Sequence, residues 1–227
     1  MRKVILAMVL MLAAVDAQAL GLKDISNTDA VGGLKEALEK GAGSAVGKLG
    51  KMDGFLGNER VKIPLPESLQ KADKTMRRFG MSKYADELVV TMNRAAEAAV
   101  PEAKVLLIDA VKTMSVEDAK GILTGGETSA TDYFRRKTSA PLAVKFRPIV
   151  EQATTKVGLA RSYNNFAGKA SRWGLISKEQ ANLDDYVTQK ALEGLFLMIA
   201  DEEKAIRANP VEQGSKLISK VFGALLK

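Results

Sequence analysis

The side chains of this sequence that could carry acid–base catalysis are Asp118, Asp132, Glu97, Glu203, Tyr133 and Tyr186. The 227-residue chain contains no histidine and no cysteine, which excludes a Ser-His-Asp triad, a thiol nucleophile, and imidazole or thiolate metal ligands. Catalytic carboxylates must converge within roughly 5–10 Å in a cleft, and nothing in the spacing of these residues predicts that convergence. We therefore favour a non-catalytic protein, with no cofactor and no metal site, over a carboxylate-based enzyme.

A basic run beside aromatic residues is the strongest candidate for ligand binding. Arg135, Arg136 and Lys137 directly follow Tyr133 and Phe134. Guanidinium and ammonium groups bind carboxylates and phosphates, so this run predicts a site for an anion or a lipid headgroup. The alternative is a solvated, charged helix face, which is the commonest role of such a run.

A second candidate is a polar cluster made of Asn93, Arg94, Glu97, Asp118 and Asp132. The first three lie on adjacent turns of one predicted helix, where Arg94 and Glu97 can pair at i,i+3. Asp118 also stands three residues after a serine, in the pattern of a capping box. The alternative for all five is therefore an ordinary structural role in helix packing and capping.

The elements that position these residues are organised around one long predicted helix, residues 183–208. Asn182 can cap its start, and Asn209-Pro210 ends it. Its middle, LFLMIA over residues 195–200, is apolar on every face, which is typical of a helix buried on all sides. The apolar stretch is too short to span a bilayer, so we expect a central helix with other helices packed around it.

The remaining sequence predicts an all-α fold of about eight or nine helices in a single domain. Prolines mark several boundaries: Pro101 should kink or split a long helix that Ser82 begins, and Pro141 should separate helix 130–140 from the next. That next helix should be interrupted near Pro148. Residues 60–64 are extended by pattern and allow at most one short strand or hairpin arm.

We divide the chain into a signal peptide (residues 1–19), a glycine-rich helical arm with a linker (20–66) and a helical domain (67–227). Arg2 and Lys3, an apolar core and the small residues before position 20 predict export with cleavage after Ala19, and hence a periplasmic protein. For the glycine-rich arm, close helix packing and a mobile amphipathic segment remain alternatives.

The sequence blocks resemble the bacterial exported family known as domain of unknown function 4197. The similar blocks cover residues 33–55, 61–69, 92–103, 117–138, 145–150, 184–210 and 220–223. They include the GLF element at Gly194-Leu195-Phe196. The resemblance implies export and an unassigned role, and it brings no catalytic residues.

Two non-catalytic functions follow for such a protein. In the first, an exported helical module binds an apolar or amphipathic, lipid-like ligand. Phe166, Trp173, Phe196 and Met198 would then line its cavity, and the basic run would meet the headgroup. The alternative is an interaction or scaffold protein of the envelope. The net charge of +7 favours anionic partners. No nucleic acid and no membrane-spanning segment of the mature chain are expected.

Overall fold

The computed structural model describes residues 25–78, 82–158, 160–164, 182–213 and 215–226. Over these residues the fold is all-helical and contains no strand, as the sequence predicts. Its helices are α1 (Asn27–Leu49), α2 (Glu67–Arg78), α3 (Lys83–Ala99), α4 (Ala103–Lys112), α5 (Val116–Thr124), α6 (Ser129–Thr154), α8 (Leu183–Ala208) and α9 (Lys216–Gly223). The predicted signal peptide, Phe166 and Trp173 lie outside the described residues.

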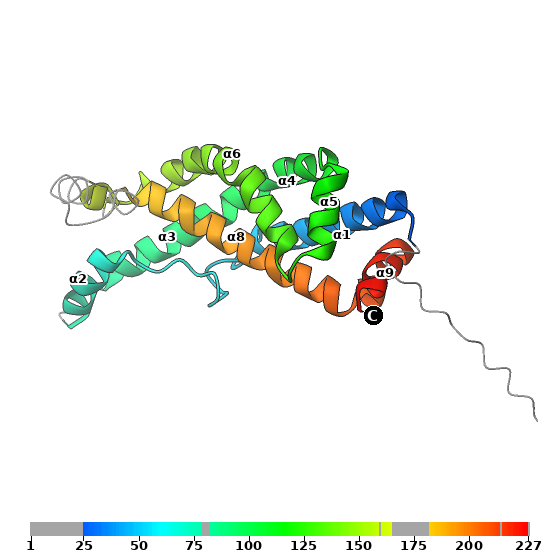
Figure 1. The fold of residues 1–227 in the computed structure, drawn as a ribbon. Helices are drawn as coiled ribbons and strands as arrows, with labels where there is room; N and C mark the ends of the chain where they lie inside the picture. The colour runs from blue at the N-terminus through cyan, green and yellow to red at the C-terminus, as the bar shows by residue number, and fades with distance from the viewer. Residues whose placement is uncertain (1–24, 79–81, 159, 165–181, 214, 227) are drawn as a thin grey trace, which may run out of the picture.

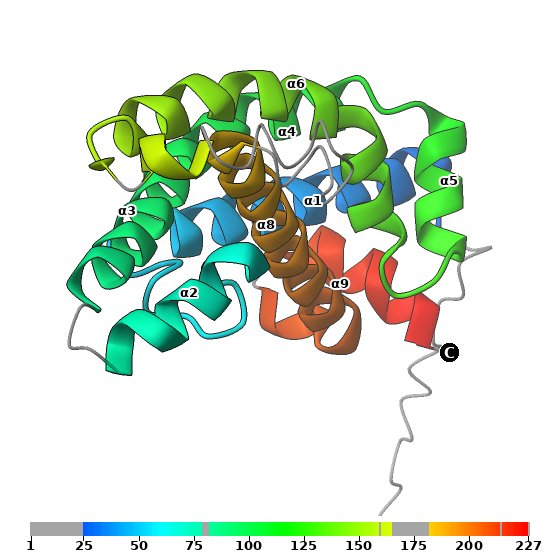
Figure 2. The same ribbon diagram turned by 90° about the vertical axis from the view of Figure 1, so that its left-hand side faces the viewer.

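Helix α8 is the centre of the fold, and its bounds are those that the sequence predicts. The Asn182 side chain accepts a hydrogen bond of 2.7 Å from the Asp184 amide, which caps the helix. In Figure 2, α8 lies in the middle of the molecule, with α6 above it and α1 behind. The pair of α6 and α8 forms the most extensive helix contact of the described fold.

The glycine-rich helix α1 packs against α4, α8 and α9 and belongs to the same core. Its small residues allow this close approach: a Cβ at Gly33 would lie 2.7 Å from a methyl carbon of Val221 on α9. Leu34 and Ala45 of the same helix are fully buried. Figure 1 shows α1 crossing behind α8, so the first described helix forms one side of the core around the central helix.

Of the three helix breaks predicted at prolines, the structure confirms one and contradicts two. At Pro101 the chain leaves α3, makes a 3₁₀ turn over Val100–Glu102 and enters α4, so the predicted split is confirmed. The breaks predicted at Pro141 and Pro148 are wrong, because both prolines lie inside the continuous helix α6.

Burial explains why α6 continues through its two prolines. An internal proline costs a helix about 3 kcal/mol, whereas fully burying one large apolar side chain contributes about 1.5–3 kcal/mol. Helix α6 buries Phe134, Leu142, Phe146 and Val150 along one face. Packing against the core therefore outweighs the two lost backbone hydrogen bonds.

Candidate functional site

The loop over residues 50–66 connects α1 to α2 and is fixed to α3 by two buried polar side chains. The Asn93 amide group accepts a hydrogen bond of 2.8 Å from the Ile63 amide and donates one of 2.9 Å to the Ile63 carbonyl. Glu97 accepts hydrogen bonds of 3.0 Å from the amides of Phe55 and Leu56. The extended segment predicted at residues 60–64 thus pairs with an asparagine side chain instead of a strand.

Arg94 completes this polar network. Its guanidinium forms the predicted i,i+3 pair with Glu97 at 2.6 Å and contacts Asp53 at 2.8 Å. Asn93 and Glu97 are both buried, and each is satisfied by backbone groups of the 50–66 loop. These three members of the predicted polar cluster therefore hold the loop in place, and Asp118 and Asp132 lie elsewhere.

Glu203 of α8 is a second buried carboxylate, and its side chain contacts the first turn of α6. Its oxygens accept hydrogen bonds from the amides of Ala130 and Thr131, at 3.0 and 2.9 Å, and from the Thr131 hydroxyl. The expected i,i+4 pair with Arg207 is present at 2.9 Å. A carboxylate at a helix N-terminus pairs with otherwise unsatisfied amides and with the helix dipole, so Glu203 fixes α6 on α8.

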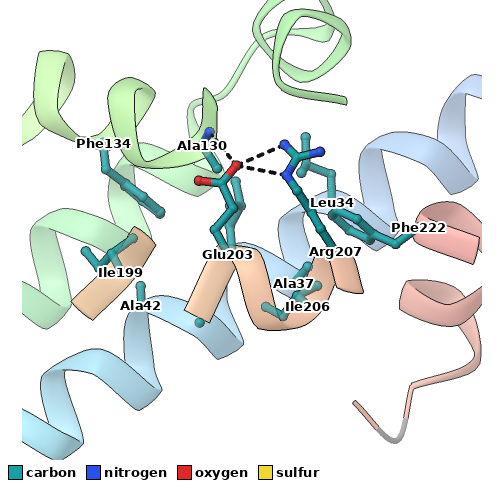
Figure 3. A pocket seen from close by; sticks show the side chains of 12 residues that line it. Leu34, Ala37, Ala42, Ala130, Phe134, Ile199, Glu203, Ile206, Arg207 and Phe222 are labelled. Atoms are coloured by element: carbon teal, nitrogen blue, oxygen red, sulfur yellow. Dashed lines mark hydrogen bonds and ion pairs between the residues drawn. The ribbon is translucent and has the colours of Figure 1, made fainter. Parts of the chain in front are cut away.

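Figure 3 shows the small cavity beside Glu203 and Arg207, lined mostly by apolar side chains of α1, α6 and α8. Its volume is about 20 Å³. One water molecule needs roughly 10–15 Å³ measured in this way, so the cavity has room for a water and not for an alkyl chain. A lipid-like ligand would have to bind in a hollow at the surface.

A hollow at the exposed middle of α8 has a basic rim, and we call it the basic groove. Its volume is about 480 Å³, and its walls are the 50–66 loop on one side and the N-terminal half of α6 on the other. Its cationic residues are Arg60, Lys62, Arg135 and Lys190. Small-molecule sites typically have volumes of about 300–1,000 Å³, so the groove has the size of a ligand site.

The floor of the basic groove is apolar. Leu197 lies there with 36% of its surface exposed, beside Phe196 and Ala200. The expectation that the apolar middle of α8 is buried on all sides is therefore wrong at Leu197. Among the described helices, none covers α8 at this position, because the loop and α6 pack on either side of it.

Arg135 differs from the other cations of the groove in its partners. Arg60 pairs with Asp201, Lys62 with Glu59, and Lys190 with Glu193. Arg135 lies with its guanidinium carbon 4.9 Å from the centre of the Phe196 ring, and no carboxylate of the described residues is within ion-pair distance. Its charge is exposed and orientated by the ring, which leaves its N–H groups available to an anion.

The predicted basic run does not form one site. Arg136 lines a different hollow, next to α5, and the Lys137 ammonium lies 5.9 Å from the centre of the Tyr133 ring. Successive residues of a helix with 3.6 residues per turn point about 100° apart, so three in a row diverge. Of the run, Arg135 alone joins Phe196 in the basic groove.

Tyr133 is buried and serves the core. Its hydroxyl donates a hydrogen bond of 2.7 Å to the Ala110 carbonyl. Burial, with a smaller contribution from Asp118, raises the pKa of Tyr133 above its ordinary value. A buried, hydrogen-bonded tyrosine with a raised pKa stays protonated at neutral pH, and this one joins α6 to α4.

Asp118 and Asp132 come together with Arg136 in the hollow between α5 and α6, whose volume is about 390 Å³. Asp118 is used in the predicted capping box, where the Ser115 hydroxyl accepts a hydrogen bond from the Asp118 amide at 3.0 Å. Asp132 lies between the two hollows and lines both. Within the described ranges, no group of three or more acidic residues is arranged to hold a metal ion.

Met198 lies away from the basic groove, toward the 50–66 loop, where the Asn58 side chain approaches its sulfur at 3.9 Å. The groove residues that sequence reasoning missed are Arg60, Lys62, Lys190 and Leu197. The three cations had no local aromatic neighbour to mark them, and the apolar run around Leu197 indicated burial. Their shared position is produced by the loop crossing α8, which no short-range pattern shows.

The geometry defines an all-helical module with a basic, apolar-floored groove across its central helix. In the part of the chain that the structure describes, no helix is both long and apolar enough to cross a membrane. The chain belongs to the family described as protein of unknown function DUF4197, whose family model matches residues 24–223. This confirms the resemblance found in the sequence. No curated protein and no solved structure matches the chain.

Proposed function

We propose that this chain is an exported, non-catalytic binding module that holds an anionic, lipid-like ligand in the basic groove. The observation that carries the proposal is Arg135, an exposed guanidinium stacked on Phe196 beside the exposed Leu197, with no carboxylate partner among the described residues. An anionic head at Arg135 and an apolar portion over Leu197 satisfy both features. Export rests on the signal-like sequence of residues 1–19.

The buried carboxylates support a binding role over catalysis. Glu97 and Glu203 were candidate acids, and each is paired with an arginine and with two backbone amides. A carboxylate whose oxygens already accept these hydrogen bonds is not free to exchange a proton with a substrate. Asp132 and Glu193 also line the groove, but its cation without an ion-pair partner among the described residues is Arg135, and this favours recognition of an anion.

Mass spectrometry of the protein purified natively from the periplasm tests the proposal first. The intact chain should begin at Leu20, and organic extraction should release a stoichiometric anionic amphiphile. A fluorescent fatty acid should bind the ligand-free protein and be displaced by the extracted compound. A protein that carries no such compound and takes up no fluorescent fatty acid would overturn the proposal and favour a search for envelope protein partners.

Adjacent arginines provide the matched variants. Arg135→Glu should weaken binding of the fluorescent fatty acid by about 10- to 100-fold, since a charge-assisted hydrogen bond contributes roughly 1.5–3 kcal/mol. Arg136→Glu makes the same charge change one residue away, in the other hollow, and should leave binding within about twofold. Equal losses in the two variants would show that net charge, and not the groove, attracts the ligand.

A further inference from the structure

A second hollow lies along the contact between α6 and α8, and we call it the apolar groove. Its volume is about 530 Å³. Ala140, Ala143 and Val144 of α6 form one wall, and Leu192 of α8 forms part of the other. Val144 has 75% of its surface exposed, so this apolar wall faces solvent.

The apolar groove continues the basic groove along the same two helices. The basic groove joins residues 128–135 of α6 to residues 190–200 of α8, and the apolar groove joins 139–147 to 185–192. Residue numbers rise along α6 as they fall along α8, because the two helices run in opposite directions. The second hollow therefore begins where the first one ends.

Two hydrogen bonds mark the junction of the grooves. On α6, the Ser139 hydroxyl of the apolar groove donates to the carbonyl of Arg135 in the basic groove at 2.6 Å. On α8, the Gln189 side chain of the apolar groove donates to the Glu193 carboxylate of the basic groove at 3.0 Å. On both walls the lining residues are thus one helical turn apart, and Arg135 lies at the junction.

Together the basic groove and the apolar groove form one continuous trough, and the side chains that line it change in character along its length. At Arg135 it offers a cation without a carboxylate partner among the described residues. Beyond Arg135 it offers mostly small and apolar side chains, with Thr188 and Gln189 on the α8 wall, as far as the ion pair of Arg147 with Asp185 at 3.1 Å. Twelve residues of helix separate Arg135 from Arg147, which gives the apolar part a length of about 18 Å at a rise of about 1.5 Å per residue.

We infer that the trough takes a single-chain anionic amphiphile, with its head at Arg135 and one acyl chain lying in the apolar groove. This rests on the proposed function and specifies its ligand class. One cation at one end fits one anionic head, and a groove walled by alanines fits one thin chain. The ligand class is a long-chain carboxylate or a single-chain phosphate ester, which share anionic oxygens and one alkyl chain.

Chain length is the direct test, with octanoate, dodecanoate and hexadecanoate as probes of the ligand-free protein. A fully buried methylene strengthens binding about fourfold, and a chain with one side in water about twofold. We expect affinity to rise about twofold per methylene and then to level off when the chain reaches Arg147. Hexadecanol, which lacks the charge, should bind at least about tenfold more weakly than hexadecanoate. A comparison of the affinities for hexadecyl phosphate and hexadecanoate shows whether the site prefers a phosphate or a carboxylate head.

Filling the apolar groove should remove the dependence on chain length. Ala143→Trp should lower hexadecanoate binding to the level of octanoate, while octanoate binding stays unchanged and remains sensitive to Arg135→Glu. Val144→Asp places a charge in the chain's path at a well-exposed position that tolerates it, and should give the same result if the tryptophan variant does not fold. Val105→Trp, an exposed valine of α4, is the control and should leave both affinities unchanged.

The outcomes separate this inference from the proposed function. If octanoate and hexadecanoate bind equally well and Arg135→Glu weakens both, the groove binds an anion and the acyl-chain assignment is wrong. If chain length matters but Ala143→Trp and Val144→Asp have no effect, the chain lies elsewhere and the inference is again overturned. If no anionic amphiphile binds in a way that depends on Arg135, the proposed function fails as well.

Discussion

At the scale of single residues, the buried carboxylates Glu97 and Glu203 are each held by an arginine and by two backbone amides. Their pairing with Arg94 and Arg207 could be predicted from spacings of three and four residues. Their burial could not, because the amides that satisfy them belong to residues 41 to 73 positions away in the sequence. Short-range patterns therefore indicated two ordinary ion pairs where the fold has two buried anchors.

Removing the Glu203 carboxylate should be strongly destabilising. Glu203→Ala leaves Arg207 half-enclosed without its partner and two α6 amides unsatisfied, and we expect a loss of about 3–5 kcal/mol in the free energy of unfolding. Its neighbour Glu202 pairs with Lys48, whose side chain is 56% exposed. Glu202→Ala should cost less than about 1 kcal/mol. Urea denaturation of both variants measures the difference, and similar losses would contradict an anchoring role for Glu203.

Tyr186 makes the free energy of unfolding depend on pH in the alkaline range. Burial, with smaller contributions from Tyr163, Glu193 and Glu67, raises the pKa of Tyr186 to about 12, and its hydroxyl donates to the Pro64 carbonyl at 3.0 Å. Tyrosine in an unfolded chain has a pKa near 10. Between these values the unfolded state binds fewer protons than the folded state, so this contribution to stability is complete below pH 10 and is lost as the pH rises to about 12.

Tyr186→Phe should therefore flatten the fall in stability between pH 10 and 12, relative to the original chain. Urea denaturation at several pH values measures the slope, and the comparison removes the titration of lysines common to both proteins. Parallel slopes would mean that Tyr186 ionises with an ordinary pKa in the folded state.

At the scale of elements, the crossing of the 50–66 loop over α8 decides where the groove lies. The crossing point is Gly194, where an added Cβ would lie 2.7 Å from a ring carbon of Phe55 and 3.3 Å from the Cβ of Val61. The loop can approach α8 this closely only because Gly194 has no side chain. Since Arg60, Lys62 and Pro64 follow on the same loop, this contact also positions one wall of the basic groove.

The same substitution at two helical glycines should change stability in opposite directions. Gly194→Ala should lower the free energy of unfolding by about 1–3 kcal/mol, because Phe55 and Val61 must move. Gly43→Ala, at an exposed position of α1, meets no atom within 4 Å. It should raise stability by about 1 kcal/mol through helix propensity. Urea denaturation measures both, and a neutral Gly194→Ala would show that the loop is not held closely on α8.

Helix ends were more predictable than helix interruptions, for a physical reason. Caps depend on residues two to four positions apart, so Asn182 and Ser115 mark the starts of α8 and α5 as the sequence indicates. Whether a proline breaks a helix depends on how much apolar surface the helix buries on both sides. For α6 that burial is decided by α3, α4 and α8, which contact it from distant parts of the sequence.

At the scale of the whole molecule, the candidate site was predicted in part. Composition and apolar patterning predict the all-helical class and the central position of α8, and the basic run includes Arg135. The trough itself is formed by three segments, the loop, α6 and α8, whose side chains meet only in the folded chain. The exposure of Leu197 in particular depends on a place on α8 that no helix of the described residues covers, which an apolar sequence does not reveal.

The contacts of the 50–66 loop also set an order of folding. The loop contacts Asn93 and Glu97 of α3 across 30 to 42 residues, whereas it meets Tyr186 and Asp201 across 122 and 141 residues. Its contacts with α8 must therefore await the formation of that helix. Contacts between distant parts of a chain carry the largest loop-closure entropy and form late. We therefore expect a folding intermediate in which Phe55 is still uncovered and the basic groove lacks one wall. Ligand affinity would then appear only in the last step of folding, after protection from hydrogen exchange of the Phe55 and Leu56 amides, which bond to Glu97 of α3.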